Sequence, residues 1–271
     1  MLIGCCVNML PKDSGDPGAW YAPEIKQAGY DYIELPIGQV VNQSQVEFEE
    51  MAVYLRDVGL PVYACNNFFI REIQLVGAKV DKPRVRDFYQ KALVWAQQLG
   101  CRYVVLGSPW SKCCPEGFAR EKALDQMCQW CVEIGDEAEK RGIIIALEPN
   151  NQQETNLLNT FADVVALAKS AGHPNIRCLQ DYYHLKMERD TVDSLVRDGK
   201  EYLVHSHFAR FDKRGFPKDW TEDAYYPVYF EALKKLHYDS GISMEGFPKS
   251  RESFAVEAAA TCRFLKEAVG R

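Results

Sequence analysis

The chain has 271 residues, of which 47% are hydrophobic and 26% are charged, so it has enough apolar side chains for a large core and is not expected to be disordered. Its formal net charge of −6 at pH 7 argues against nucleic acid or an anionic membrane surface as the main partner. The sequence has no apolar run of about 18 residues, which a membrane-spanning helix needs. Its first residues do not show the basic segment followed by an apolar segment that is typical of a signal peptide. We therefore expect a cytoplasmic protein without a membrane span.

The ten cysteines do not form the pattern of a secreted disulfide framework, because the chain is long and they fall inside predicted strands and helices. Cys128 and Cys131 form a CxxC pair within a long helical pattern, and the sequence has no second CxxC, so packing is favoured over a zinc or redox role. Cys113 and Cys114 follow a predicted strand end, where packing or a pocket wall is favoured over catalysis.

One pattern recurs eight times along the chain: a short apolar run rich in β-formers, a turn, and a helical pattern. Strands that alternate with helices indicate a parallel sheet. The predicted strands are Leu2–Asn8, Tyr32–Leu35, Val62–Asn66, Tyr103–Gly107, Ile143–Glu148, Ile176–Asp181, Tyr202–His207 and Ile242–Glu245.

Helical patterns fill the intervals, for example Val85–Leu99, Arg120–Lys140 and Phe161–Ala171. Glycines separate helical patterns from following strands, where a left-handed residue ends a helix: Gly29, Gly59, Gly100, Gly142, Gly172 and Gly241. Eight such units in 271 residues predict an α/β protein with a single (β/α)8 TIM barrel domain over residues 1–271. A doubly wound open sheet is the alternative, but the first strand is followed by neither G-x-G-x-x-G nor a P-loop.

The last four predicted strands each end in a side chain that can bind a metal. Barrel enzymes carry their chemistry at the carboxyl ends of the strands. These side chains are Glu148, Asp181, His207 and Glu245.

Side chains of a barrel strand alternate between the interior and the helix layer. Ile144, Ala146 and Glu148 therefore share one face of the fifth strand, and Leu203, His205 and His207 share one face of the seventh. We expect the four strand-end residues to converge.

Three carboxylates and an imidazole cannot all keep their charge at close range without a compensating cation. One divalent ion meets that need, and a set of three oxygens and one nitrogen favours Mn²⁺, with Mg²⁺ or Co²⁺ as alternatives. Each residue also has a structural interpretation. Glu148 precedes Pro149 and ends a strand, Asp181 caps a helix, and His205 or His207 is a core histidine.

The set Glu148, Asp181-Tyr-Tyr-His184, His205-Ser-His207 and Glu245 resembles the xylose-isomerase-like superfamily of sugar isomerases and epimerases. Within it, the chain is most similar to the ketose 3-epimerases of D-tagatose and D-psicose, with hydroxypyruvate isomerase near by. The D-x-x-H and H-x-H motifs indicate the superfamily rather than one member.

The resemblance implies that Glu148, Asp181, His207 and Glu245 are the metal ligands. It also implies that Glu148 and Glu245 act as acid and base on opposite faces of the substrate.

Further family positions imply substrate contacts. His184 and Glu154 match positions that hydrogen-bond substrate oxygens. Arg214 matches a family arginine if one residue is inserted, with Lys213 as the alternative. The loop GSPWSKCCPEGF, which starts at Gly107, matches no particular member and leaves the substrate open.

These roles predict removal of a proton beside a ketone, formation of an enediolate, and return of a proton to the opposite face or to the adjacent carbon. Epimerisation and aldose–ketose isomerisation both use this residue set. Glu34 is expected to contact substrate or to form an interior salt bridge, and Trp110 and Phe68 are expected to stack on a sugar or to pack.

The predicted partner is a small sugar or sugar phosphate, for which Lys213, Arg214 and Lys249 could supply charge, and the family implies a homodimer or homotetramer. A dehydratase of a keto-inositol or of a dehydroshikimate-like acid is the main alternative. An abasic-site endonuclease would need further histidines at the third and fourth strand ends, which read CNNF and LGSP. A non-catalytic carbohydrate-binding barrel would not need two opposed glutamates.

Overall fold

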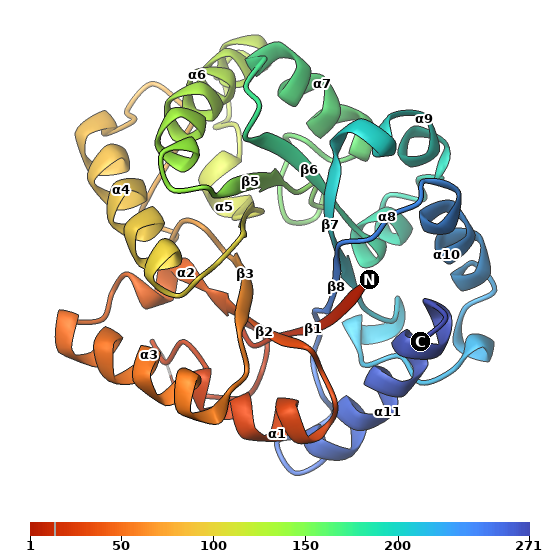
Figure 1. The fold of residues 1–271 in the computed structure, drawn as a ribbon. Helices are drawn as coiled ribbons and strands as arrows, with labels where there is room; N and C mark the ends of the chain where they lie inside the picture. Colours follow the sequence, from red (N-terminus) through yellow and green to blue (C-terminus); the bar gives the residue numbers. More distant parts are fainter. Residues whose placement is uncertain (14) are drawn as a thin grey trace.

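The computed structural model describes residues 1–13 and 15–271, and in it the chain forms a closed barrel of eight parallel strands in sequence order (Figure 1). The last strand pairs with the first, for example at Leu2 and Gly241. The predicted TIM barrel is confirmed, and the strand ends differ from the predicted ones by no more than two residues. The strands are β1 (Leu2–Cys6), β2 (Tyr32–Pro36), β3 (Val62–Asn66), β4 (Tyr103–Leu106), β5 (Ile144–Leu147), β6 (Ile176–Asp181), β7 (Leu203–Phe208) and β8 (Gly241–Met244).

Helices form a ring around this barrel and connect each strand to the next (Figure 1). The α-helices are α1 (Ala22–Gln27), α2 (Ile37–Val40), α3 (Gln45–Val58), α4 (Lys82–Gln98), α5 (Pro109–Lys112), α6 (Arg120–Glu139), α7 (Phe161–Ala171), α8 (Tyr182–Met187), α9 (Asp193–Tyr202), α10 (Tyr226–Lys235) and α11 (Phe254–Ala268). Short 3₁₀ turns lie at η1 (Ala19–Tyr21), η2 (Asp212–Arg214) and η3 (Trp220–Glu222).

Most of the predicted glycine stops are left-handed residues after helices. Positive φ angles are found at Gly29, Gly59, Gly100, Gly142 and Gly172. The prediction for Gly241 is wrong, because this residue is the first of β8, and the left-handed residue after α10 is His237, with φ 52°. A Cβ on Gly241 would lie 2.5 Å from the Tyr32 hydroxyl, so a close approach across the barrel requires glycine there.

The apolar side chains form two layers. A small cluster fills the barrel interior, namely Val105, Ala146 and Leu179. The large cluster lies between strands and helices and includes Ile143, Ile145 and Leu147. The alternation predicted for the fifth strand is therefore confirmed.

The alternation predicted for the seventh strand is wrong at its first residue. Cys178 pairs with Leu203 but Leu179 pairs with His205, so Val204 is an extra residue in β7. Leu203 consequently belongs to the outer cluster, and Val204 packs against the interior one. Beyond this bulge His205 and His207 keep the interior side.

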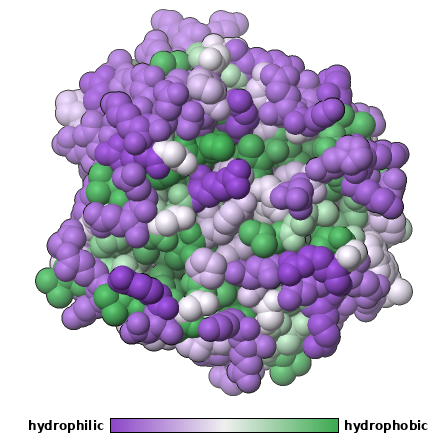
Figure 2. Space-filling model, viewed as in Figure 1, coloured by the Kyte–Doolittle hydropathy of each residue, from purple (hydrophilic) through white to green (hydrophobic). Residues whose placement is uncertain are grey.

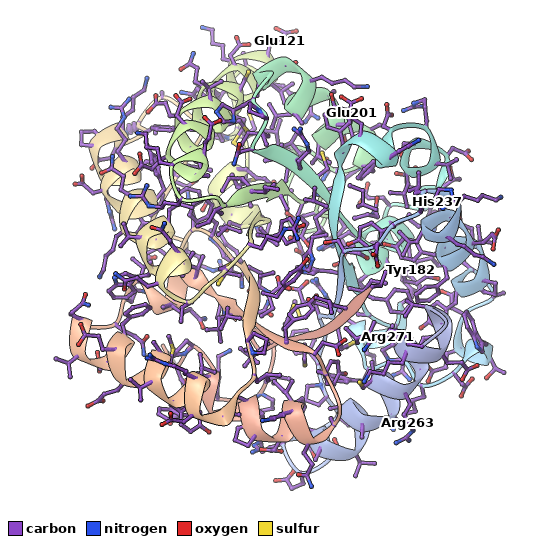
Figure 3. The ribbon with its side chains drawn as sticks, viewed as in Figure 1. Glu121, Tyr182, Glu201, His237, Arg263 and Arg271 are labelled. Atoms are coloured by element: carbon purple, nitrogen blue, oxygen red, sulfur yellow. The ribbon has the colours of Figure 1, made fainter. Side chains whose placement is uncertain are left out.

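Polar side chains cover the outside of the helix ring (Figure 2). In Figure 3 the labelled Glu121, Glu201 and Arg263 project outward, and Tyr182 lies within the ring, buried and 4.7 Å from the Phe208 ring. Across the described ranges, no helix has both the length and the apolar character that crossing a membrane requires. All ten cysteines are free, and Cys131 packs in the core.

Candidate metal and acid–base site

Four buried side chains from consecutive strands meet at the carboxyl end of the barrel. Each offers a ligand atom that lies within 4.8 Å of the others: Glu148, Asp181, His207 and Glu245. His207 Nδ1 lies 3.0 Å from Glu148 Oε1 and 3.2 Å from Glu245 Oε2. The structure thus brings together all four residues that the sequence analysis names as a metal-binding set.

Asp181 ends β6 and also begins the next helix. Its Oδ1 accepts a hydrogen bond of 2.8 Å from the Tyr183 N–H and caps α8, so the capping interpretation is confirmed. Its Oδ2 faces the cluster, 2.9 Å from Arg214 Nη2 and 3.5 Å from His184 Nε2. One carboxylate therefore fixes the turn with one oxygen and leaves the other for the site.

Glu148 occupies a space that its neighbouring strand must leave free. The Glu148 N–H donates to the Leu106 carbonyl at 3.2 Å, which continues the pairing of β5 with β4. A Cβ on Gly107 would lie 2.0 Å from Glu148 Oε2. Glycine at the end of β4 is therefore needed to let the carboxylate turn into the barrel.

A buried carboxylate holds the far side of His207. Glu34 Oε1 accepts from His207 Nε2, and Glu34 Oε2 accepts from His205 Nε2, both at 2.8 Å. Ser243 Oγ donates to Glu34 Oε2 at 2.5 Å. With Nε2 bonded to Glu34, Nδ1 is the nitrogen that faces the cluster, and it can bind an ion once it has lost its proton. The interior salt bridge is the interpretation of Glu34 that the structure confirms.

The charges of this cluster shift its proton affinities in different directions. Burial raises the pKa of Asp181 to about 7, although Arg214 opposes the shift. Burial would also raise the pKa of Glu245, but the positive charges of His207 and Arg214 outweigh burial and hold the Glu245 pKa well below its usual range. Burial would lower the pKa of His207, yet Glu34 and Glu245 hold it well above the ordinary value. The buried acids therefore depend on nearby positive charge.

The residues named for substrate contacts border the cluster. His184 is buried, its Nδ1 accepts from the Asn151 N–H at 3.2 Å, and its Nε2 lies 4.0 Å from Glu154 Oε2. Burial, together with the charge of Arg214, lowers the pKa of His184 well below its ordinary value. Burial also raises the pKa of Glu154. A neutral imidazole and a carboxyl group thus lie side by side at the edge of the cluster.

Arg214, rather than Lys213, enters the site. Arg214 is buried, and its Nη2 lies 2.6 Å from Glu245 Oε2, while Nη1 lies 3.6 Å from Glu154 Oε1. Its guanidinium lies over the Tyr183 ring, 4.6 Å from the ring centre. Lys213 is exposed. Both have positive φ angles, 56° for Lys213 and 47° for Arg214, so the backbone of this turn directs Arg214 inward.

Three site residues were not named from the sequence. Asn8 and Asn66 donate to Glu245 Oε1 at 2.8 Å and 3.2 Å, from the ends of β1 and β3. Lys112, in α5, donates from Nζ to the Glu148 carbonyl at 2.5 Å. Burial lowers the pKa of Lys112 to about 8. The asparagines carry a signal that was available, since both stand at predicted strand ends.

The remaining aromatic and cysteine predictions fall outside the cluster. Phe68 is fully buried and packs 4.5 Å from the Phe69 ring, so it is a core residue. Trp110 is half-buried, and its indole N–H donates to the Phe69 carbonyl at 3.2 Å. Cys114 contacts Asn156 through its backbone N–H, at 2.8 Å from the side-chain oxygen, and this bond secures the loop after β4.

The donor set fits a divalent cation. Three carboxylates and one imidazole nitrogen within 4.8 Å of one another are the ligands that Mn²⁺, Mg²⁺ or Co²⁺ accept. The Cys6 thiol lies 3.8 Å from His207 Nε2, on the side of the ring that faces away from this set. Arg214 already neutralises part of the charge of Asp181 and Glu245, which shows that these oxygens attract a cation.

Comparisons with known proteins agree with this architecture. A profile of the family described as Xylose isomerase-like TIM barrel matches residues 23–268. The 3-dehydro-D-guloside 4-epimerase of Escherichia coli K12 is 25% identical over 235 residues, which cover 82% of this chain and 84% of the relative. The L-ribulose 3-epimerase of Methylomonas sp. DH-1 is 25% identical over 227 residues, which cover 82% and 75%.

A solved structure shares the fold. The D-psicose 3-epimerase from Clostridium cellulolyticum H10, solved with D-tagatose, matches with a TM-score of 0.82 and 17% identity over 99% of both chains.

Proposed function

Since the chain belongs to the xylose isomerase-like TIM barrel family, we propose that it is a divalent-metal-dependent epimerase or isomerase of a small keto sugar. One observation carries the proposal. Two carboxylates, Glu148 after β5 and Glu245 after β8, approach the same imidazole nitrogen of His207 at 3.0 and 3.2 Å. They reach the centre from strands separated by β6 and β7, so a ligand between them has a carboxylate on each side.

The reaction follows from these positions. When bound by Glu148, Asp181, His207 and Glu245, a divalent ion would polarise a ketone and acidify the neighbouring C–H bond. Glu148 then accepts the proton of that C–H bond from one face of the sugar. The electron pair of the broken C–H bond forms the enediolate. Glu245, once it has taken up a proton from solvent or from the preceding turnover, gives that proton to the other face, which inverts the carbon, and the proton left on Glu148 returns to solvent. Proton return to the adjacent carbon would instead give isomerisation.

The flanking groups support the orientation of a polyhydroxylated substrate. His184 and Glu154 offer a donor and an acceptor at the edge of the cluster, 4.0 Å apart. Asn8 and Asn66 both hold Glu245 Oε1, so the other oxygen of Glu245 faces the site. The curated relatives described above are named as epimerases of a guloside and of L-ribulose, which favours a sugar over the keto-inositol or dehydroshikimate-like acid of the dehydratase alternative.

We favour an unphosphorylated sugar. Lys213 and Lys249 are exposed, and the Arg214 guanidinium is engaged by carboxylates. Barrel phosphate sites use backbone amides after the seventh and eighth strands. Here the Gly215 N–H donates to the Asp212 carbonyl and the Phe247 N–H to the Arg214 carbonyl, so both amides are already bonded. Mn²⁺ as the ion, a homodimer or homotetramer, a single domain over 1–271 and a cytoplasmic location stay predictions.

The test is proton exchange. The Mn²⁺-loaded protein is incubated in D₂O with free and phosphorylated ketoses, keto-glycosides and keto-inositol, and each carbon is followed by NMR. Deuterium should enter beside the ketone of an unphosphorylated sugar. Glu148→Gln and Glu245→Gln should lower epimer formation by about 10²-fold or more, because each removes one proton-transfer group. The matched control is Glu137→Gln in α6, whose carboxylate pairs with Lys140.

The products separate the alternatives. Loss of water from any substrate would favour the dehydratase, and a complete lack of exchange would contradict the proposal. Full activity of the Glu148→Gln variant would also contradict it.

A further inference from the structure

The loop after β4 contains a buried lysine that the proposed reaction does not use. Lys112 is 0% exposed and lies at the end of α5. Within residues 1–13 and 15–271, Lys112 forms no salt bridge, and its Nζ donates to the Glu148 carbonyl at 2.5 Å. A buried lysine without an ion pair is costly, because burial removes the hydration of the ammonium group. The hydrogen bond to the Glu148 carbonyl offsets part of this cost.

The backbone around Lys112 is built to aim it at Glu148. Ser108 has φ 24°, a strained value, and its hydroxyl accepts from the Phe69 N–H at 2.9 Å. The Ser111 hydroxyl donates to the Ile70 carbonyl at 3.3 Å, and the Ser111 carbonyl accepts from the Leu75 N–H at 2.8 Å. The loop after β3 therefore fixes the residues on the amino-terminal side of Lys112.

Glu148 is held on three sides by this one segment and the strand before it. Its N–H donates to Leu106, its carboxylate fills the space over Gly107, and its carbonyl accepts from Lys112. The residue that follows is Pro149, which has no N–H of its own to offer. Lys112 thus secures the end of β5 at the residue that carries the proposed base.

Glu245, on the other side of the cluster, has different supports. Asn8, Asn66 and Arg214 contact its carboxylate, and its N–H donates to the Phe208 carbonyl. Apart from His207 Nδ1, which lies close to both carboxylates, the two glutamates are therefore positioned by separate groups.

From this asymmetry we infer that Lys112 is a positioning residue for Glu148. Proton transfer at the face of the sugar next to Glu148 depends on Lys112, and proton transfer at the face next to Glu245 does not. The inference rests on the proposed function. At the Glu148 face the C–H bond breaks, the proton moves to a Glu148 oxygen, and the electron pair enters the enediolate. At the Glu245 face the C–H bond breaks in the same way, and its proton moves to a Glu245 oxygen. Each of the two epimers therefore loses its proton to a different glutamate.

Isotope exchange in D₂O resolves the two faces. The epimer whose C–H faces Glu245 can lose a proton to Glu245 and regain a deuteron from it, which labels that epimer without inverting it. This exchange needs Glu245 alone. Label in the other epimer, and epimerisation itself, need Glu148.

The experiment measures both exchanges with Lys112→Met, which keeps the apolar stem and removes the ammonium group. Exchange in the epimer that faces Glu148 and epimerisation should fall by about 10²-fold, the usual effect of a misplaced reacting group. Exchange in the other epimer should change less than about threefold. Lys112→Arg, which retains charge and donors, should recover part of the loss. Lys122→Met, on the exposed side of α6, is the control.

A second readout does not depend on turnover. Mn²⁺ affinity by calorimetry and melting temperature are measured on the same samples, and the affinity should fall by no more than about tenfold, because Glu148 is only one of the four metal ligands. If Lys112→Met does not fold, Lys112→Gln carries the same test. Equal slowing at both faces, or a fall in Mn²⁺ affinity that matches the fall in rate, would overturn the inference. Deuterium exchange that is unchanged in both epimers would also overturn the inference. No exchange with the unaltered protein would overturn the proposed function, and the assignment of Lys112 with it.

Discussion

Glu34→Gln tests whether the carboxylate below His207 controls metal binding. Glu34 is 0% exposed, and its two oxygens accept from the Nε2 atoms of His205 and His207 at 2.8 Å each. Glutamine has one acceptor oxygen, so its NH₂ group must face one of these two N–H donors. A hydrogen bond to a charged group contributes about 1.5–3 kcal/mol. Either orientation of the amide also removes the negative charge that holds the His207 Nε2–H, so Glu34→Gln should weaken metal binding by about 10–100-fold, the range usual for partners of a ligating histidine.

The assay is calorimetric titration of Mn²⁺ into the metal-free protein at pH 8, where Asp181, with a pKa of about 7, is ionised. Glu137→Gln removes a carboxylate that pairs with Arg141 at the outer helix layer, and it should bind Mn²⁺ like the unaltered protein. The reasoning about Glu34 is refuted if Glu34→Gln folds, melts within about 2 °C of the unaltered protein and binds Mn²⁺ within about threefold of its affinity.

Further measurements test the rest of the cluster. Mn²⁺ affinity should rise by roughly tenfold or more per pH unit between pH 6 and 7, because Asp181, with a pKa of about 7, and His207, whose pKa is raised, must lose protons to bind the ion; an affinity that is flat with pH would contradict this. Because the Asp181 pKa is raised, protonated Asp181 stabilises the metal-free fold fully at pH values below its ordinary pKa of 3.8, and this contribution is lost as the pH rises through 7. The rise in melting temperature caused by Mn²⁺ should therefore grow from pH 5 to pH 8. Gly107→Ala should displace the Glu148 carboxylate and lower Mn²⁺ affinity by about tenfold with little loss of stability, and unchanged affinity would show that the carboxylate relocates freely. Arg214→Met should lower the melting temperature of the metal-free protein more than that of the Mn²⁺-loaded protein, and equal losses would contradict a charge-balancing role.

The barrel and the metal set could be predicted because they depend on local regularities. A strand places alternate side chains on one face, and parallel strands of a closed barrel end at one rim, so Asp181 and His207 can be brought together from residue order alone. The same regularity fails where the backbone departs from it. Val204 is an extra residue in β7, and neither its apolar character nor its neighbours distinguish it from an ordinary strand residue.

Contacts between distant loops were beyond the reach of the sequence. Lys112 reaches Glu148 only because the loops after β3 and β4 bind each other through Ser108 and Ser111. Its position 36 residues before Glu148 gives no periodic signal. The role of Gly241 could not be predicted for the same reason. Glycine can end a helix or can make room for a close contact, here with Tyr32, and only the position of that partner across the barrel decides between the two roles.

The metal-free cluster already contains a cation, and this constrains how the site can be loaded. Arg214 Nη2 lies 2.9 Å from Asp181 Oδ2 and 2.6 Å from Glu245 Oε2, and these oxygens belong to the donor set. An ion that takes them competes with the guanidinium for the same negative charge. Arg214 Nη1 lies 3.6 Å from Glu154 Oε1, so a guanidinium released from the two ligands still has a carboxylate at the edge of the cluster. Loading the ion should therefore shift Arg214 toward Glu154, where the resemblance places the substrate oxygens.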